Sequence, residues 1–400
     1  MTRIDIPDGS LFGLANLPYG VFSIRGASPR VGVRVADSVV DLAVALGDPV
    51  FALPTLNAFM AQGRSRWEQV RRQVTELVAG DVHSDAVHPV SEVTLHLPVE
   101  VADYVDFYAS EHHAANLGRL FRPDGEPLMP NWKHLPVGYH GRAGTVVVSG
   151  TGIVRPCGQR KAPGQSAPTF GESERLDIEA ELGFIVGVGS PLGEPVPASA
   201  FPDHVFGAVL VNDWSARDIQ AWEYVPLGPN LGKSFATSIS PWVVPLTALE
   251  AARVPLPGQD PEPLPYLRED EPWGLDIDLA VEWNGEVVSR PPYRTMYWSP
   301  AQMLAHMTVN GARARTGDLY ASGTVSGPER HQRGAFIELT EGGRNPITVK
   351  GERRTFLQDH DEVAITATAP ATDGGRLGFG EVRGRILPAR APRRRPRTRR

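Results

Sequence analysis

A mainly β fold of the α+β class is predicted from the sequence, and three observations support it. Glycine and proline make up about a fifth of the chain, with 41 glycines and 37 prolines in 400 residues, so turns are frequent. Apolar and β-branched residues gather in short runs bounded by these turn residues, as they do in strands. The 3.6-residue periodicity of helices is confined to a few segments. We therefore expect many short strands and few helices.

The first predicted domain, residues 1–97, consists mainly of strands. β-branched runs separated by turn residues predict these strands, which are residues 19–24, 31–36 and 38–42. One helix is predicted over residues 55–77, because apolar residues recur there with helical spacing, from Leu56 to Leu77. Residues 81–97 are expected to form a linker with one short strand.

The second predicted domain, residues 98–388, repeats the pattern of short strands and Gly/Pro turns. Its clearest predicted strands are residues 144–149, 206–212, 275–283 and 361–369. Within 275–283, every second residue is apolar, which predicts one buried face. One helix is predicted over residues 299–308, with Ser299 as its N-cap and Pro300 as its first residue.

Composition excludes several classes of protein. Hydrophobic residues make up 41% and charged residues 22% of the chain, as in soluble globular proteins. No apolar run approaches the roughly 18 residues of a membrane span, and the first residues lack the apolar core of a secretory signal. Cys157 is the only cysteine, so disulfides within the chain are excluded and a reducing cytoplasm is expected.

A basic tail contrasts with an acidic body. Residues 390–400 contain seven arginines and no acid, while the whole chain carries a net charge of −6. We expect residues 389–400 to be a disordered arginine-rich tail. The acidic body argues against nucleic acid as a partner, and no membrane partner is expected.

Two glutamates, Glu179 and Glu181, lie just before a segment that is predicted to be a buried strand, residues 182–188. Alternate side chains of an extended segment lie on one face, so the two carboxylates share a face. At about 4 Å their repulsion costs roughly 1 kcal/mol in water and about 4 kcal/mol at an effective dielectric near 20. A cation, a shared proton or exposure to water must offset it.

Another carboxylate, Asp213, stands at the end of the predicted strand 206–212. It is either a site residue on a rigid strand end or the N-cap of a short helix predicted over residues 214–222. Arg217 and Gln220 lie on one face of that helix. They are either a solvated surface pair or two donors for an anionic substrate.

Asp106 and Tyr108 are expected to share one face of an extended segment. The histidines that follow, His112 and His113, are adjacent and point apart, so they do not readily chelate one ion together. A lone histidine is more often a satisfied polar residue than a base, but Asp106 and Tyr108 favour a functional role here.

Lys233 is the single charged residue of a long glycine-rich loop. The loop is one residue too short for a phosphate-binding motif, so nucleotide binding is not expected. A lone cation in such a loop is better suited to stabilise an oxyanion. Glu338 lies inside an apolar segment that is predicted to be a strand, where alternation favours exposure to solvent.

Taken together, these residues predict a site built from carboxylates. An all-oxygen set suits a hard cation, Mg²⁺ or Ca²⁺, better than zinc. The four candidate ligands are Asp106, Glu179, Glu181 and Asp213.

The chain resembles the fumarylacetoacetase family over nearly its whole length, from Asn16 to Leu387. The most specific matching segments are residues 106–108, 135–142, 212–220, 222–229, 231–235, 240–245 and 322–329. The wider superfamily shares only the Glu-x-Glu pair and the later aspartate. The N-terminal unit, the segment around Tyr139, and Lys233 indicate the narrower family.

The resemblance implies a fold, an assembly and a place in metabolism. The fold is a small N-terminal SH3-like β-barrel followed by a mixed β-roll catalytic domain, and the assembly is a homodimer. The implied reaction is the hydrolysis of 4-fumarylacetoacetate, the last step of tyrosine and phenylalanine catabolism.

The resemblance also assigns roles to residues. It makes Asp106, Glu179, Glu181 and Asp213 the ligands of Ca²⁺, Mg²⁺ or both, with Lys233 and Thr237 near the ion. It makes His113 the general base, held by Glu338, and it makes Arg217, Gln220 and Lys233 the groups that stabilise a developing carbanion. The implied substrate contacts are Tyr108, Arg122, Tyr139, Gln220, Tyr224 and Thr324.

The implied chemistry accounts for these residue types. The substrate is a β-diketo acid, whose diketone oxygens a hard cation binds and polarises. His113 deprotonates a water molecule while Glu338 fixes its tautomer. Arginine and tyrosine suit the terminal carboxylates.

Two alternatives compete with this interpretation. One is a related acylpyruvate or β-diketone hydrolase, or a keto-acid decarboxylase or isomerase; these resemble only the C-terminal domain, so residues 1–97 argue against them. The other is a non-catalytic protein of the same fold that is stabilised by Ca²⁺.

Overall fold

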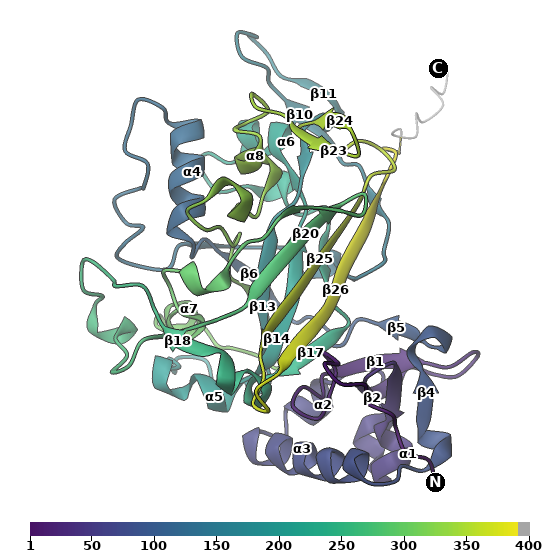
Figure 1. Cartoon of the computed structure of the whole chain (residues 1–400). Helices are drawn as coiled ribbons and strands as arrows, with labels where there is room; N and C mark the ends of the chain where they lie inside the picture. Colours follow the sequence, from purple (N-terminus) through teal and green to yellow (C-terminus); the bar gives the residue numbers. More distant parts are fainter. Residues whose placement is uncertain (391–400) are drawn as a thin grey trace, which may run out of the picture.

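The computed structural model describes residues 1–390, and it shows a strand-rich α+β protein (Figure 1). Its main sheet runs through both halves of the chain in the order β4-β3-β2-β1-β17-β14-β13-β22-β6-β7. A second sheet, in the order β21-β20-β25-β26-β9, packs over one face of β13 and β14. The mainly β, α+β class is thus confirmed, whereas the SH3-like barrel stays a prediction.

The N-terminal part contains five strands and three α-helices. The strands are β1 (Tyr19–Ser23), β2 (Arg30–Val35), β3 (Ser38–Asp41), β4 (Val87–Pro89) and β5 (Thr94–His96). The helices are α1 (Leu42–Leu46), α2 (Asn57–Met60) and α3 (Arg64–Ala79).

The longer C-terminal part carries the remaining elements. The strands of the main sheet and of the adjoining small sheets are β6 (Tyr104–Phe107), β7 (Gly138–His140), β8 (Val146–Val148), β10 (Cys157–Arg160), β11 (Thr169–Glu172), β12 (Leu176–Asp177), β13 (Ala180–Val186), β14 (Val205–Asp213), β15 (Ser215–Ala216), β16 (Thr237–Ile239), β17 (Trp242–Pro245), β18 (Arg253–Pro255), β19 (Trp273–Leu275), β22 (Leu319–Ala321), β23 (Ile347–Val349) and β24 (Glu352–Arg354). The second sheet contains β9 (Ile153–Val154), β20 (Asp278–Trp283), β21 (Glu286–Ser289), β25 (Glu362–Pro370) and β26 (Arg376–Leu387). The helices are α4 (Glu111–Phe121), α5 (Phe201–His204), α6 (Arg217–Glu223), α7 (Pro300–Thr308) and α8 (Phe336–Leu339).

The central strands β13 and β14 separate two hydrophobic cores. On one face, Leu182 and Phe184 pack with residues of the second sheet, and on the other face Ile185 and Val209 pack with residues of the N-terminal part. Because side chains alternate along a strand, each strand contributes to both cores. Both strands are buried along their whole length, so they form a rigid base for side chains at their ends.

The N-terminal strands join the main sheet through β1 and β17. Gly20 of β1 lies opposite Trp242 of β17 in an antiparallel pair. A Cβ atom at Gly20 would lie 2.6 Å from the indole ring of Trp242, so this close approach requires glycine.

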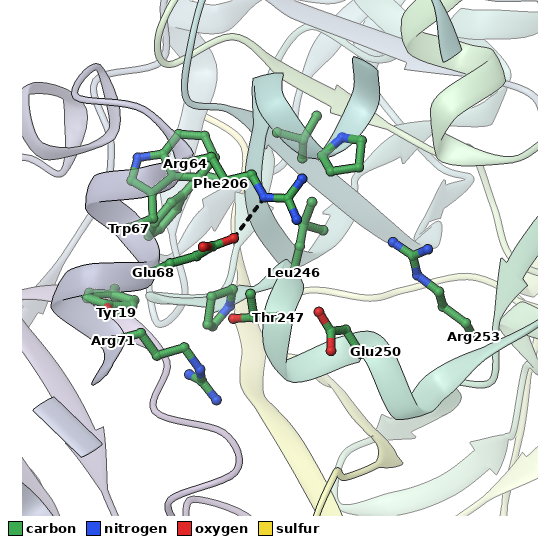
Figure 2. A pocket seen from close by; sticks show the side chains of 13 residues that line it. Tyr19, Arg64, Trp67, Glu68, Arg71, Phe206, Leu246, Thr247, Glu250 and Arg253 are labelled. Carbon is green, nitrogen blue, oxygen red and sulfur yellow. Dashed lines mark hydrogen bonds and ion pairs between the residues drawn. The ribbon is translucent and has the colours of Figure 1, made fainter. Parts of the chain in front are cut away.

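Aromatic side chains reinforce the same junction. Phe206 of β14 packs against Tyr19, Phe59 and Trp67, with ring centroids 5.4, 5.7 and 5.3 Å away. Figure 2 shows Tyr19, Trp67 and Phe206 lining a pocket between α3 and the segment that carries Leu246. The three contacts tie three residues of the N-terminal part to one side chain of the C-terminal part.

Several predicted elements are confirmed. The predicted strands 19–24, 31–36, 206–212 and 361–369 correspond to β1, β2, β14 and β25. Helix α7 begins as predicted, with Ser299 and Gln302 forming a capping box around Pro300. Residues 275–283 alternate between buried and partly exposed positions, although the segment is divided between β19 and β20.

The single helix predicted over residues 55–77 is wrong. The structure has α2, then a turn, then α3. Gly63 interrupts the helical path with φ = 85° and ψ = 170°, a conformation that only glycine adopts readily. Apolar periodicity continues across this turn, because both helices face the same core.

The predicted disordered tail, residues 389–400, lies largely outside the described residues, which end at 390. Among residues 1–390, none of the helices has the length and apolar character needed to cross a membrane. The division into domains 1–97 and 98–388 stays a prediction.

The aromatic junction gives a test of the fold. We expect Phe206→Ala to lower the free energy of unfolding by roughly 3–5 kcal/mol, because a buried ring contacting three others is replaced by a cavity. Urea denaturation measures this loss. The control is Phe170→Ala, since Phe170 is 64% exposed and its loss is expected to change stability by less than about 0.5 kcal/mol. Equal losses in the two variants would contradict the proposed importance of the junction.

Candidate active site and metal centre

Four carboxylates converge at the ends of strands β14, β13 and β6 of the main sheet. Asp213 is the last residue of β14, and its backbone N–H donates to the carbonyl of Glu179 just before β13. Glu181 lies in β13 on the same face as Glu179, since alternate residues of an extended segment share a face. Asp106 reaches the site from β6, which is joined to β13 through β22.

The site is compact and buried. One carboxylate oxygen from each of the four residues lies within 4.8 Å of the others. All four residues are buried, with at most 5% of any residue exposed. Exposure to water, one of the three ways to offset the Glu179–Glu181 repulsion, is therefore excluded.

Two buried cations offset part of the negative charge. Nζ of Lys233 donates to carboxylate oxygens of both Glu179 and Asp213, the latter at 2.8 Å. The guanidinium of Arg217 donates to Oε1 of Glu179 at 2.8 Å. Burial disfavours the charged forms of Lys233 and Arg217, but the neighbouring carboxylates outweigh burial and raise the pKa of both groups. Both side chains therefore stay charged.

The same cations act on Glu179. Burial alone would raise the pKa of the Glu179 carboxyl, but Lys233 and Arg217 outweigh it and hold that pKa below its usual range. Asp213 is held by neutral donors as well, because it accepts from the hydroxyls of Tyr139 at 2.7 Å and Thr237 at 2.8 Å.

The other two carboxylates are left without enough partners. Both carboxylate oxygens of Glu181 and Oδ1 of Asp106 are buried and accept no hydrogen bond. Burial, together with the neighbouring carboxylates, raises the pKa of Glu181 and of Asp106 well above the usual range. Buried acceptors without donors are costly, so either bound protons or an added cation must satisfy these oxygens.

These observations fit a divalent metal ion. The ligands are carboxylate oxygens, which hard cations prefer. Glu181 and Asp106 have oxygens without hydrogen-bond donors, and an added cation would favour the ionised form of both carboxyls. The cluster of Asp106, Glu179, Glu181 and Asp213 is thus the candidate metal centre.

A histidine–carboxylate pair lies beside the carboxylate cluster. Nδ1 of His113 is 2.7 Å from Oε2 of Glu338, and Nε2 of His113 is 3.9 Å from Oε1 of Glu179. Ser110 caps α4 by accepting from the backbone N–H of His113, which places the histidine in the first turn. The imidazole therefore has one nitrogen on Glu338 and the other facing the cluster.

Glu338 is held ionised in a buried position. Burial favours its neutral form, but His113 and hydrogen bonds from His113, Asn116 and Ser326 outweigh burial and lower the pKa of Glu338. The Asn116 amide donates to Oε1 at 2.9 Å and the Ser326 hydroxyl donates to Oε2 at 2.9 Å. Three neighbouring groups thus fix this carboxylate.

The remaining predicted site residues surround this centre at different distances. Arg217 also donates to Oε1 of Gln220 at 3.1 Å, so these two form a pair in which Arg217 is buried and Gln220 is partly buried. The ring of Tyr108 meets that of His113 edge-on at 5.2 Å. The hydroxyl of Thr324 is buried without a partner.

Two predicted substrate contacts lie at the exposed margin. Tyr224 is 40% exposed, and its ring centroid lies 6.3 Å from that of Phe121. Arg122 follows α4 and donates to the carbonyl of Pro127 at 3.0 Å. No hydrogen bond joins Arg122 or Tyr224 to the four carboxylates within residues 1–390.

Two expectations from the sequence are corrected here. The prediction that Glu338 lies exposed on a strand is wrong, because Glu338 is buried in α8, a single helical turn. The alternative of Asp213 as a helix N-cap is also wrong, because α6 begins at Arg217 after Ala216.

Sequence reasoning missed the groups that hold the site in place. Asn116 and Ser326 bind Glu338, and the buried carboxylate of Asp177 binds Arg217 at 2.8 Å. The spacing of Asn116, three residues after His113, was a usable signal for one helical face. Asp177 precedes Glu179 by two residues, so the same alternation was a usable signal for it. Ser326 approaches from a distant segment, and no local pattern marks it.

The sequence matches two family models that together span most of the chain. Residues 15–98 match the model described as "Fumarylacetoacetase N-terminal", and residues 103–387 match the one described as "Fumarylacetoacetate (FAA) hydrolase C-terminal".

Curated proteins are similar over nearly the full length. Fumarylacetoacetase of Homo sapiens is 47% identical across 98% of this chain and 100% of its own length. The Caenorhabditis elegans protein is 47% identical across 96% of this chain and 99% of its own. Fumarylacetoacetase of Arabidopsis thaliana is 43% identical across 96% of this chain and 98% of its own.

Solved structures share the fold at low sequence identity. A fumarylacetoacetate hydrolase from Exiguobacterium antarcticum superposes with a TM-score of 0.58 at 18% identity, covering 94% of this chain and 100% of that one. A maleylpyruvate hydrolase from Sphingobium sp. SYK-6, solved with a manganese (II) ion and pyruvate, gives a TM-score of 0.53 at 14% identity, covering 94% of this chain and 100% of that one.

The raised pKa values of Asp106 and Glu181 give a pH test of the metal centre. A cation must displace the protons on these carboxyls, so we expect Mn²⁺ affinity to rise with pH and Mn²⁺ binding to release protons. A carboxyl whose pKa is raised by folding stabilises the protein below its unfolded pKa. Metal-free protein should therefore lose stability as pH rises through the raised pKa values, and Mn²⁺ should restore it.

Isothermal titration of Mn²⁺ in two buffers with different ionisation enthalpies measures the protons released. Glu181→Gln should weaken binding strongly, whereas Glu194→Gln, a change at an exposed glutamate, should leave it unchanged. Binding that is independent of pH and releases no proton would contradict the assignment.

Proposed function

The chain belongs to the fumarylacetoacetase family, and we propose that its buried carboxylates and the His113–Glu338 pair carry out the family's reaction. The protein is a hydrolase that cleaves a C–C bond of 4-fumarylacetoacetate, releasing fumarate and acetoacetate. The observation that carries the mechanistic proposal is the orientation of His113, which has Nδ1 on Glu338 and Nε2 toward the carboxylate cluster.

The metal in this proposal is Ca²⁺, Mg²⁺ or both. Asp106, Glu179, Glu181 and Asp213 would hold it, and the buried oxygens of Glu181 that lack hydrogen-bond donors support this assignment. Lys233 and Thr237 stand beside Asp213 and complete the surroundings of the ion. When bound, such an ion supplies Lewis-acid polarisation of the diketone oxygens.

His113 is the proposed general base. Glu338 accepts a hydrogen bond from Nδ1–H, so Nε2 is left free to take a proton from water on the side of the cluster. The ionised Glu338 then stabilises the imidazolium that results, as the carboxylate does in other histidine-based sites. Asn116 and Ser326 keep Glu338 from turning away.

The bond changes balance as follows. The hydroxide left by proton removal adds to the carbonyl carbon of the fumaroyl group. The bond from that carbon to the methylene between the two ketones breaks, and its electron pair leaves with the acetoacetate as an enolate. The imidazolium of His113 then returns the proton, so one water molecule is consumed overall.

Three donors are placed to stabilise the enolate. Lys233 and Arg217 are buried and positively charged, and Gln220 is fixed by Arg217. Fixed positive groups in a dry site stabilise developing negative charge more than water does.

The substrate contacts are proposed from the family. Tyr108 and Tyr139 lie against His113 and Asp213, close to the reacting atoms. Arg122, Tyr224 and Thr324 are proposed to contact the more distant parts of the β-diketo acid. Arginine suits a terminal carboxylate because it offers two parallel N–H donors.

The wider setting follows the family as well. We propose a cytoplasmic homodimer that acts in the last step of tyrosine and phenylalanine catabolism, with an SH3-like N-terminal domain. The competing acylpyruvate hydrolases and keto-acid decarboxylases are disfavoured, because residues 15–98 match the fumarylacetoacetase N-terminal model.

The activity is tested directly by near-ultraviolet absorbance. Purified protein with added Ca²⁺ or Mg²⁺ should consume fumarylacetoacetate with loss of its absorbance, and a chelator should slow the reaction. A metal-replete sample without turnover would refute the activity.

Glu338→Gln separates the roles of base and metal ligand. We expect kcat to fall by roughly 10²–10⁴-fold, because general-base catalysis contributes that much, while Mn²⁺ affinity stays unchanged. Glu271→Gln, a change at an exposed position, is the control and should affect neither. Loss of metal binding in Glu338→Gln would instead make Glu338 a ligand.

A further inference from the structure

Asp177 is a fully buried carboxylate two residues before Glu179, and three of the four hydrogen bonds that its side chain accepts come from groups that support the site. Its Oδ2 accepts from Nε of Arg217 at 2.8 Å and from the backbone N–H of Ile337 at 3.0 Å. Its Oδ1 accepts from the backbone N–H of Phe336 at 2.8 Å, and of Ile178 at 2.8 Å. One side chain thus binds two structures that are far apart in the sequence.

The first structure is the support of the metal centre. Arg217 has Nε on Asp177 and donates from its terminal nitrogen to Oε1 of Glu179 at 2.8 Å. A guanidinium is a rigid planar fork, so fixing Nε also fixes the nitrogen that binds Glu179. Asp177 therefore sets the orientation of a proposed metal ligand through Arg217.

The second structure is the helical turn that carries Glu338. Helix α8 is four residues long, and its N-cap residue, Ala335, provides no side-chain cap. The first N–H groups of a helix need acceptors, and here Asp177 supplies them from another segment at Phe336 and Ile337. Glu338 follows these two residues directly, so its distance to His113 depends on where this turn is anchored.

We propose that Asp177 is a positioning residue for hydrolysis, which holds Glu179 through Arg217 and Glu338 through α8 in one fixed arrangement. This inference rests on the proposed roles of Glu179 as a metal ligand and Glu338 as the partner of the base. It gives the metal half and the proton-transfer half of the site a shared anchor that touches neither substrate nor ion.

A purely structural role for Asp177 makes different predictions, and Asp41 provides the matched comparison. Asp41 is also fully buried, accepts from the first N–H groups of a helix (Ala43 at 3.0 Å and Val44 at 3.3 Å), and pairs with an arginine, Arg30. It lies in the N-terminal part of the chain and has no contact with the site. Loss of either carboxylate should destabilise the fold, but only Asp177 should affect catalysis.

The first experiment compares Asp177→Asn with Asp41→Asn below the melting temperature of both. In Asp177→Asn, the amide oxygen can still accept from the N–H of Phe336. The amide NH₂ group then faces the N–H donors of Arg217 and Ile337, which lose their acceptor. We expect the Mn²⁺ affinity, measured by electron paramagnetic resonance, to fall by roughly 10–100-fold, as for other groups that orient metal ligands. At saturating Mn²⁺, kcat for fumarylacetoacetate should still be at least about tenfold lower. Asp41→Asn should change neither quantity.

The second experiment asks whether Asp177 acts through Glu338. In a double-mutant cycle, Asp177→Asn combined with Glu338→Gln should lower kcat much less than the product of the two single effects, because both remove the same function. A double variant whose loss equals that product would overturn the proposal. So would an Asp177→Asn variant that is destabilised like Asp41→Asn but keeps Mn²⁺ affinity and kcat.

Asp177→Ser is the second variant, for the case in which the asparagine variant does not fold. A hydroxyl keeps an acceptor for one backbone N–H and places no amide against Arg217, and Asp41→Ser is its control. Failure of the proposed function is distinguishable from failure of this inference. In the first case the unaltered protein itself lacks turnover, whereas in the second it turns over normally and the Asp177 variants match their controls.

Discussion

Four carboxylates packed into a buried site are the constraint on which the rest of the structure depends. Asp106, Glu179, Glu181 and Asp213 bring their oxygens within 4.8 Å of one another without access to bulk water. Lys233 and Arg217 offset only part of this charge, since Arg217 also pairs with Asp177. We propose that a divalent cation supplies what remains, at the oxygens of Glu181 and Asp106 that lack donors.

The fold meets this constraint by using strands that are rigid on both faces. The two cores on either side of β13 and β14 fix the backbone from which Glu181 and Asp213 project. Hydrogen bonds then fix the side chains in turn: Tyr139 and Thr237 hold Asp213, and Asn116 and Ser326 hold Glu338. Catalytic geometry is maintained when supporting groups are themselves locked by packing and hydrogen bonds.

The sequence predicts the parts of this site that depend on local geometry. The period of two along an extended chain correctly placed Glu179 and Glu181 on one face, and the spacing of Arg217 and Gln220 correctly placed these two on one side of a helix. The fold class followed from turn residues and short strands. Family resemblance, and not local pattern, indicated the partnership of His113 with Glu338, because these residues are 225 positions apart.

Local pattern failed where tertiary contacts decide the structure. Four residues around Glu338 look like part of a strand, yet they form one helical turn because Asp177 supplies its first N–H groups with acceptors. Gly63 divides a continuous apolar pattern into two helices through its backbone angles.

The most direct test of the central claim is anomalous diffraction from crystals grown with Mn²⁺. One strong peak within bonding distance of Asp106, Glu179, Glu181 and Asp213 is expected. A peak elsewhere, or none at this cluster, would contradict it.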